Sequence, residues 1–233
     1  MNLFKKITPF LLVSVLLSAC GGEEDASRIV IGDSNIIHEL NELQYQWPLV
    51  IQVSDIDGNP APFSRVTLTV KTIFYGIGRY YETSDGWGVN FDPAVTTSPL
   101  SIYCRAEDLN NNAVLDAGED VNDTGILEPT NSSTLAAHPE LVPTLTTGSN
   151  ILITDEFGFG YFSLTYPKSE STWSGFKITA ESNVLGTENI ATLEGVLPVS
   201  LQDLSDTDIP PPGGRFSTYG PNPSDPACVP YDG

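Results

Sequence analysis

Apolar and polar residues alternate with a period of two in two separate parts of the chain, residues 45–75 and 150–198. Such alternation is typical of β-strands that bury one face and expose the other. The apolar positions on the predicted buried faces are Leu49, Ile51, Val53, Val66, Leu68, Val70, Phe162, Leu164, Tyr166, Phe176, Ile178 and Ala180. A last strand is predicted over residues 190–197, so the chain contains two blocks of strands.

Clusters of turn-forming residues separate the predicted strands. Residues 55–60 read Asp-Ile-Asp-Gly-Asn-Pro, and residues 154–160 read Thr-Asp-Glu-Phe-Gly-Phe-Gly. No long segment places apolar residues at positions i, i+3, i+4 and i+7, so little helix is expected. Several short strands with turns between them predict an all-β fold, an antiparallel β-sandwich.

The strands and turns together resemble bacterial Ig-like domains of the invasin/intimin type. In that family a strand is followed by an Asp- and Gly-containing turn that ends in Asn-Pro, and then by a strand that begins Val-Thr-Leu. The matching residues here are the turn at 55–62, the strand start at 66–68, Thr154, Asp155 and Gly158 in the second turn, and the closing strand at 176–180. The resemblance implies an Ig-like fold for the sandwich.

The resemblance also implies how the chain is divided. An Ig-like β-sandwich is expected over residues 45–202, interrupted at about 76–150 by a long loop insertion that the family pattern lacks. Residues 203–233 are rich in proline, with three consecutive prolines at 210–212. This composition predicts an extended C-terminal tail.

The first twenty residues have the pattern of a secretory signal. Two lysines precede an apolar stretch at 7–17, which is too short to span a bilayer. The stretch ends in Leu-Ser-Ala-Cys at 17–20, which resembles the lipobox of bacterial lipoproteins. That resemblance implies removal of the signal peptide at 1–19 and a lipid on Cys20. Gly21 stands where this family carries its sorting residue, and it implies the outer membrane.

A lipid on Cys20 would anchor the protein without a transmembrane helix, because two or three acyl chains hold a protein stably on a bilayer. Residues 20–44 show no convincing periodicity and are predicted to be a tether between the lipid and the sandwich, with a short strand at 29–31. The alternative is an ordinary signal peptide in which Cys20 is incidental. The sequence leaves open whether the protein faces the periplasm or the cell surface.

The chain is strongly acidic, with 30 Asp and Glu against 10 Lys and Arg among 233 residues, a net charge of −20. This charge excludes ordinary nucleic-acid binding, which requires a basic surface. Two explanations remain open: the carboxylates bind hard cations, or they keep the protein soluble.

The predicted insertion contains a twelve-residue pattern that matches a calcium-binding loop, at residues 108–119. Such a loop requires oxygen donors at positions 1, 3, 5, 7, 9 and 12, with a backbone carbonyl at position 7. The predicted ligands, in that order, are Asp108, Asn110, Asn112, Val114, Asp116 and Glu119. Position 6 departs from the pattern, because it holds Ala113 where a glycine favours the required positive φ.

A second, partial copy of this pattern follows at once, so the whole predicted calcium region spans residues 108–131. Its predicted ligands are Asp120, Asn122, Thr124, Ile126 and Glu128. Gly125 occupies position 6, but Asn131 stands at position 12, where it is a weaker donor than glutamate. The tandem resembles EF-hand, dockerin and thrombospondin-type calcium repeats, which implies calcium as the ion. The alternative is a solvated acidic loop that uses Asn, Asp and Gly as turn formers.

Two further cysteines, Cys104 and Cys228, remain in the chain after the predicted processing. Exported proteins reach an oxidising compartment, so this pair is predicted to form a disulfide that ties the tail to the insertion. The alternative is two unrelated thiols or an intermolecular bond.

No catalytic motif is recognisable in the sequence. The chain has only two histidines, no zinc-ligand spacing, no G-x-S-x-G elbow and no P-loop. We therefore expect a non-enzymatic, outer-membrane-anchored lipoprotein that acts at the cell surface as a calcium-stabilised Ig-like interaction or adhesion module for an unidentified protein or glycan. The alternative is a glycan-binding or secretion and surface-assembly accessory lipoprotein.

An aromatic patch between Phe74 and Phe91 would bind glycan if exposed, or pack on the sandwich if buried.

Overall fold

The computed structural model describes residues 28–110, 112–121, 123–130, 132–142, 145–146, 148–182, 189–224 and 228–231. The predicted signal peptide and Cys20 lie outside the described residues, and so do Asn122 and Asn131. Within the described part of the chain, no helix combines the length and the apolar content needed to cross a bilayer.

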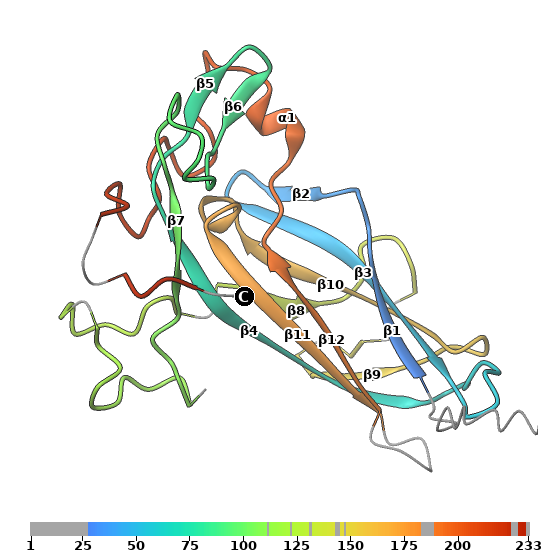
Figure 1. The fold of residues 1–233 in the computed structure, drawn as a ribbon. Coiled ribbons are helices and arrows are strands. Elements are labelled where there is room, and N and C mark those ends of the chain that lie inside the picture. Colours follow the sequence, from blue (N-terminus) through green and yellow to red (C-terminus); the bar gives the residue numbers. More distant parts are fainter. Residues whose placement is uncertain are drawn as a thin grey trace, which may run out of the picture.

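The first sheet has five strands, all paired antiparallel, around the long strand β3 (Figure 1). Its strands are β1 (Arg28–Asp33), β2 (His38–Asn41), β3 (Gln44–Ser54), β8 (Thr134–Ala136) and β10 (Phe159–Pro167). The strands β1 and β2 pair with different parts of β3 on one edge, and β10 pairs along its other edge.

The second sheet also has five antiparallel strands, and β4 is its longest. Its strands are β4 (Arg65–Ile77), β7 (Ile102–Arg105), β9 (Ile151–Ile153), β11 (Ser174–Ser182) and β12 (Asn189–Val196). The strand β4 pairs with β11 on one edge, and with β9 and β7 at successive parts of the other edge.

The two sheets enclose one hydrophobic core, which confirms the predicted all-β sandwich. The predicted inward positions of β3 and β10 are nearly inaccessible, and Trp47 of the first sheet packs edge-on against Phe176 of the second at 5.4 Å between ring centroids. Of the apolar positions predicted from the alternation, only Val70 is half-buried. The finer Ig-like assignment stays a prediction.

Two turns that lie far apart in the sequence join strands in the same way. In each turn an aspartate, Asp55 or Asp155, accepts backbone N–H groups two and four residues ahead on its Oδ1 atom. A glycine three residues after the aspartate takes a positive φ, 81° at Gly58 and 78° at Gly158. The sequence similarity between the two strand blocks is therefore also a similarity of backbone structure.

The sandwich extends beyond the predicted boundaries. Residues 28–41, predicted as tether, supply β1 and β2, and the predicted insertion supplies β7 and β8. These strands are short or lie on sheet edges, so their sequences lack the sustained alternation of a half-buried strand. Their place is set by pairing with the long central strands.

The predicted tail lies against the end of the sandwich. A small hairpin, β5 (Tyr81–Thr83) and β6 (Gly86–Gly88), stands there beside the short helix α1 (Leu201–Leu204) (Figure 1). A 3₁₀ turn, η1 (Lys168–Glu170), follows β10. The Trp87 indole N–H donates to the carbonyl oxygens of Asp206 and Ile209, which holds the chain after α1 against the hairpin.

Candidate functional site

The first predicted calcium loop follows β7 and is organised around Asp108. The two carboxylate oxygens of Asp108 accept the backbone N–H groups of Asn112 and Ala113, each at 3.0 Å. Ala113 has a φ of 60°, so position 6 adopts the left-handed conformation of the calcium-loop pattern even without glycine. The Oδ1 atom of Asn112 accepts the N–H of Val114 at 2.7 Å, which tightens the turn further.

The remaining predicted ligands of this loop converge on Asp116 and Glu119. The side-chain amides of Asn110 and Asn112 both donate to Oδ2 of Asp116, at 2.7 and 2.8 Å, and these bonds hold the pKa of Asp116 below its usual range. Glu119 is buried and accepts the N–H groups of Leu109 and Asp116 on its two oxygens. The carboxylates at positions 1, 9 and 12 are thus held by the loop's own amide and N–H groups.

The second loop repeats the geometry of the first. The two oxygens of Asp120 accept the N–H groups of Thr124 and Gly125, each at 3.0 Å, and Gly125 has a φ of 71°. The hydroxyl of Thr124 accepts the N–H of Ile126 at 3.4 Å. Position 1 therefore binds positions 5 and 6 in both loops. The predicted ligand Asn122 lies outside the described residues.

Glu107 closes the second loop and was missed by the sequence analysis. It is 2% exposed, and its two oxygens accept the N–H groups of Val121 at 3.2 Å and Glu128 at 2.9 Å. These are positions 2 and 9 of the second loop, the same positions that Glu119 binds in the first. Burial raises the pKa of Glu107 despite these hydrogen bonds. The signal in the sequence is its twelve-residue spacing from Glu119.

The oxygen donors of the two loops suit a hard cation. Among the residues that the structure describes, no three His, Cys, Asp or Glu side chains are grouped as a metal site. The loops combine few carboxylates with amides, a hydroxyl and backbone carbonyls, and Ca²⁺ accepts such mixed oxygen shells. The donor chemistry therefore fits calcium, while the oxygens are held here by hydrogen bonds. Calcium binding stays a prediction.

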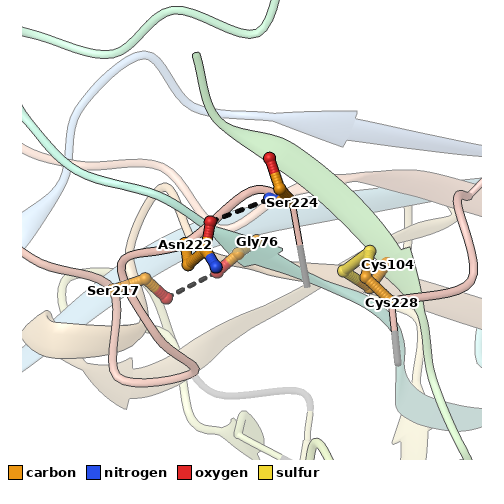
Figure 2. Close-up of a disulfide and its surroundings, with 6 residues drawn as sticks. All are labelled: Gly76, Cys104, Ser217, Asn222, Ser224 and Cys228. Carbon is orange, nitrogen blue, oxygen red and sulfur yellow. Dashed lines mark hydrogen bonds between the residues drawn. A yellow bond between two sulfur atoms is a disulfide. The ribbon is translucent and has the colours of Figure 1, made fainter. Parts of the chain in front are cut away.

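The predicted disulfide between Cys104 and Cys228 is present, with 5.2 Å between the two Cα atoms (Figure 2). Cys104 lies on β7 and is fully buried. Beside it, the N–H of Arg105 donates to the carbonyl oxygen of Val229 at 2.7 Å, and the N–H of Tyr231 donates to that of Tyr103 at 3.0 Å. The end of the tail therefore runs along β7 and covers its outer edge.

The aromatic patch between Phe74 and Phe91 is a packing cluster. Phe74, Tyr75, Tyr80 and Trp87 are at most 6% exposed. Tyr80 packs edge-on against the buried Trp173, with ring centroids 5.2 Å apart. The patch is therefore not an exposed platform for a sugar ring.

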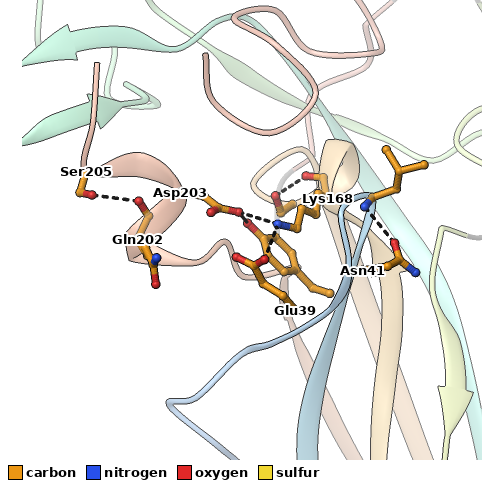
Figure 3. A network of polar contacts seen from close by, with 9 residues as sticks. Glu39, Asn41, Lys168, Gln202, Asp203 and Ser205 are labelled. Atoms are coloured by element: carbon orange, nitrogen blue, oxygen red, sulfur yellow. Dashed lines mark hydrogen bonds and ion pairs between the residues drawn. The ribbon is translucent and has the colours of Figure 1, made fainter. Parts of the chain in front are cut away.

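A half-buried cation forms a second polar centre, which has no motif in the sequence (Figure 3). The Lys168 ammonium lies 3.0 Å from Asp203 and 3.3 Å from Glu39, and 4.8 Å from the centre of the Tyr45 ring. Burial alone would lower the pKa of Lys168, but its two carboxylate partners raise it above the usual value. The Tyr45 hydroxyl also donates to Asp203. The network joins β2, β3, η1 and α1 beside a pocket of about 1080 Å³.

Comparison with known proteins adds no relative. The chain matches no known family, and no curated protein matches its sequence.

Proposed function

We propose that the protein is a non-enzymatic lipoprotein, anchored in the outer membrane through Cys20. Its β-sandwich would act at the cell envelope as an interaction or adhesion module, stabilised by calcium in the loops at 108–131. The observation that carries the calcium part is the repeated hydrogen-bond pattern of two consecutive twelve-residue loops. The repeat gives both loops the same arrangement of Asp oxygens and backbone, as a tandem of calcium loops requires.

The lipid anchor rests on the sequence at 17–20, because Cys20 lies outside the described residues. The interaction role rests on the fold, a rigid sandwich with long connections, and on the lack of any catalytic motif. The alternative of glycan binding through the aromatic patch loses its support, since that patch is buried.

Thermal unfolding with and without calcium tests the proposal. Extracellular calcium modules bind with Kd of about 10⁻⁴ to 10⁻³ M. At about 5 mM Ca²⁺ such sites add about 1–2 kcal/mol to the free energy of unfolding, which raises the Tm by about 2–8 °C. We expect this rise in the unchanged protein and its loss in the double variant Asp108→Ala and Glu119→Ala. Asp108→Asn serves as a milder second variant that keeps the side-chain size.

The matched control removes the same residue types from two exposed turns, Asp57→Ala together with Glu156→Ala. It should keep the calcium response, because neither acid belongs to the loops. An unchanged Tm at millimolar calcium in the native protein would contradict the calcium proposal. An equal response to Mg²⁺ would contradict its ion assignment.

A further inference from the structure

A pocket of about 370 Å³ brings together the only two histidines of the chain. His38 comes from β2, and His138 follows β8. The strand β3 contributes Pro48, Leu49 and Val50 to the lining, β10 contributes Tyr161, and Asp33 and Glu140 also line the pocket.

The pocket is lined by two carboxylates and by no lysine or arginine. None of its lining residues is Lys or Arg, and within the described part of the chain the only ion-pair contact of Asp33 or Glu140 is with His38, at 3.9 Å from Glu140. Burial lowers the pKa of His138, which favours the neutral ring. Its Nδ1 accepts the N–H groups of Glu140 and Leu141, so the neutral ring carries its hydrogen on Nε2. That nitrogen is then a donor and not a metal ligand.

The chain places a cation on an aromatic ring beside carboxylates at two other sites. Lys168 lies over Tyr45 between Glu39 and Asp203. Arg215 lies over Trp87, 4.5 Å from the ring centre, and pairs with Glu82.

The pocket also contains aromatic rings together with carboxylates. Tyr161 and His138 form two perpendicular aromatic walls, with ring centroids 6.0 Å apart and planes at 78°, and Asp33 and Glu140 supply the carboxylates. Neither a lysine nor an arginine is among the residues that line it, and the ion-pair contact there is between His38 and Glu140.

We propose that this pocket receives a basic side chain, arginine or lysine, from a partner protein. The cationic head would pair with Asp33 and Glu140, and its stem would lie on the Tyr161 ring and the apolar floor. Ile36 and Leu141, 59% and 46% exposed, border the pocket and give the partner's backbone an apolar rim. This inference rests on the proposed role as an interaction module and names the chemistry of its partner.

The test is binding of small cations to the purified full-length protein at pH 7.5 and low salt, followed by NMR. The probes are n-butylguanidinium and n-butylammonium, with the neutral N-butylurea as the shape control. We expect both cations to shift the ring signals of Tyr161 and His138 with millimolar affinity, and N-butylurea to leave them unchanged. The variant Asp33→Asn with Glu140→Gln should weaken cation binding about tenfold.

The control Asp57→Asn with Glu156→Gln makes the same change of net charge at exposed turns outside the pocket lining and should bind the cations normally. Equal weakening in both variants would reduce the effect to general electrostatics and overturn the proposal. Equal shifts with N-butylurea, or shifts with simple sugars but not with cations, would also overturn it. The calcium test does not involve this pocket, so failure of one proposal leaves the other measurable.

Discussion

At the scale of single residues, Gly58 and Gly158 show how the same turn can tolerate different changes. Both glycines have nearly the same positive φ, 81° and 78°. A Cβ atom at Gly58 would meet nothing within 4 Å, whereas one at Gly158 would lie 2.6 Å from the carbonyl oxygen of Val53. The two positions therefore separate the cost of the backbone conformation from the cost of a steric clash.

Alanine at each glycine should give different losses of stability. Gly58→Ala is expected to cost about 1 kcal/mol, the penalty of placing a Cβ in the left-handed region. Gly158→Ala adds overlap with the β3 backbone and should cost about 2–4 kcal/mol. Urea unfolding of both variants measures the difference, and equal losses would show that the turn relaxes to accept the extra carbon.

Asp203 is a second residue whose surroundings determine its chemistry. Burial alone would raise its pKa, but hydrogen bonds from Tyr45 and Lys168 and the charge of Lys168 outweigh burial, so the pKa lies below the usual 3.8. Because the folded pKa is lower than the unfolded one, the network stabilises the protein above about pH 4. This contribution is lost as the pH falls through the folded pKa.

The variant Asp203→Asn should therefore lose about 1–3 kcal/mol at pH 7, because Lys168 and Tyr45 lose their charged partner. The difference in the free energy of unfolding between this variant and the unchanged protein should become smaller at pH 3.5 and below. Denaturant unfolding at the two pH values checks this expectation, with Asp208→Asn in an exposed position as the control. A difference that stays constant with pH would mean that the Asp203 carboxylate is not the titrating group.

At the scale of elements, the two consecutive loops are closed by glutamates that both lie outside the second loop. Glu119 ends the first loop and precedes the second, yet it binds only N–H groups of the first. Glu107 precedes the first loop and binds N–H groups of the second. Sequence spacing identified Glu119 but assigned Asn131 to the matching position of the second loop, because spacing alone assumes that each loop supplies its own acid.

If calcium occupies both loops, Glu107→Gln should remove the second ion selectively. Glutamine keeps the size and one acceptor oxygen, but it cannot supply a bidentate carboxylate. Isothermal titration is expected to give two ions for the unchanged protein and one for Glu107→Gln. Glu119→Gln should instead remove the ion of the first loop. Two ions in Glu107→Gln would show that the second loop is closed by another donor.

The position of the C-terminal tail is fixed by contacts with residues far away in the sequence. The Ser217 hydroxyl donates to the carbonyl oxygen of Gly76, near the Asn222 and Ser224 turn and the disulfide (Figure 2). Tyr219 donates to Glu170, and its ring packs on Tyr75 at 5.0 Å. These contacts fix a segment whose proline content predicts only extension. They join residues far apart in the sequence, so no local pattern reveals them.

At the scale of the whole molecule, the proposed lipid anchor decides where the sandwich works. In a Gram-negative host the protein should sediment with the outer membrane, and mass spectrometry of its N-terminal peptide should find acyl chains on Cys20. Cys20→Ala should release the protein from the membrane, because the variant lacks the thiol to which the lipid is attached. Membrane attachment that survives this change would contradict the lipid anchor.

The sequence alone determined the sandwich class, the buried faces of the long strands, the twin turns and the repeated loop spacing. Each of these depends on residues close together in the chain, where strand periodicity and turn chemistry act. It also predicted the disulfide, because only two cysteines lie outside the predicted signal sequence and lipidation site. Only the tertiary structure decided that β1, β2, β7 and β8 join the sheets and that the aromatic patch is buried. It alone brought Glu107 to the second loop and the two histidines to one pocket, because these features depend on contacts between distant segments.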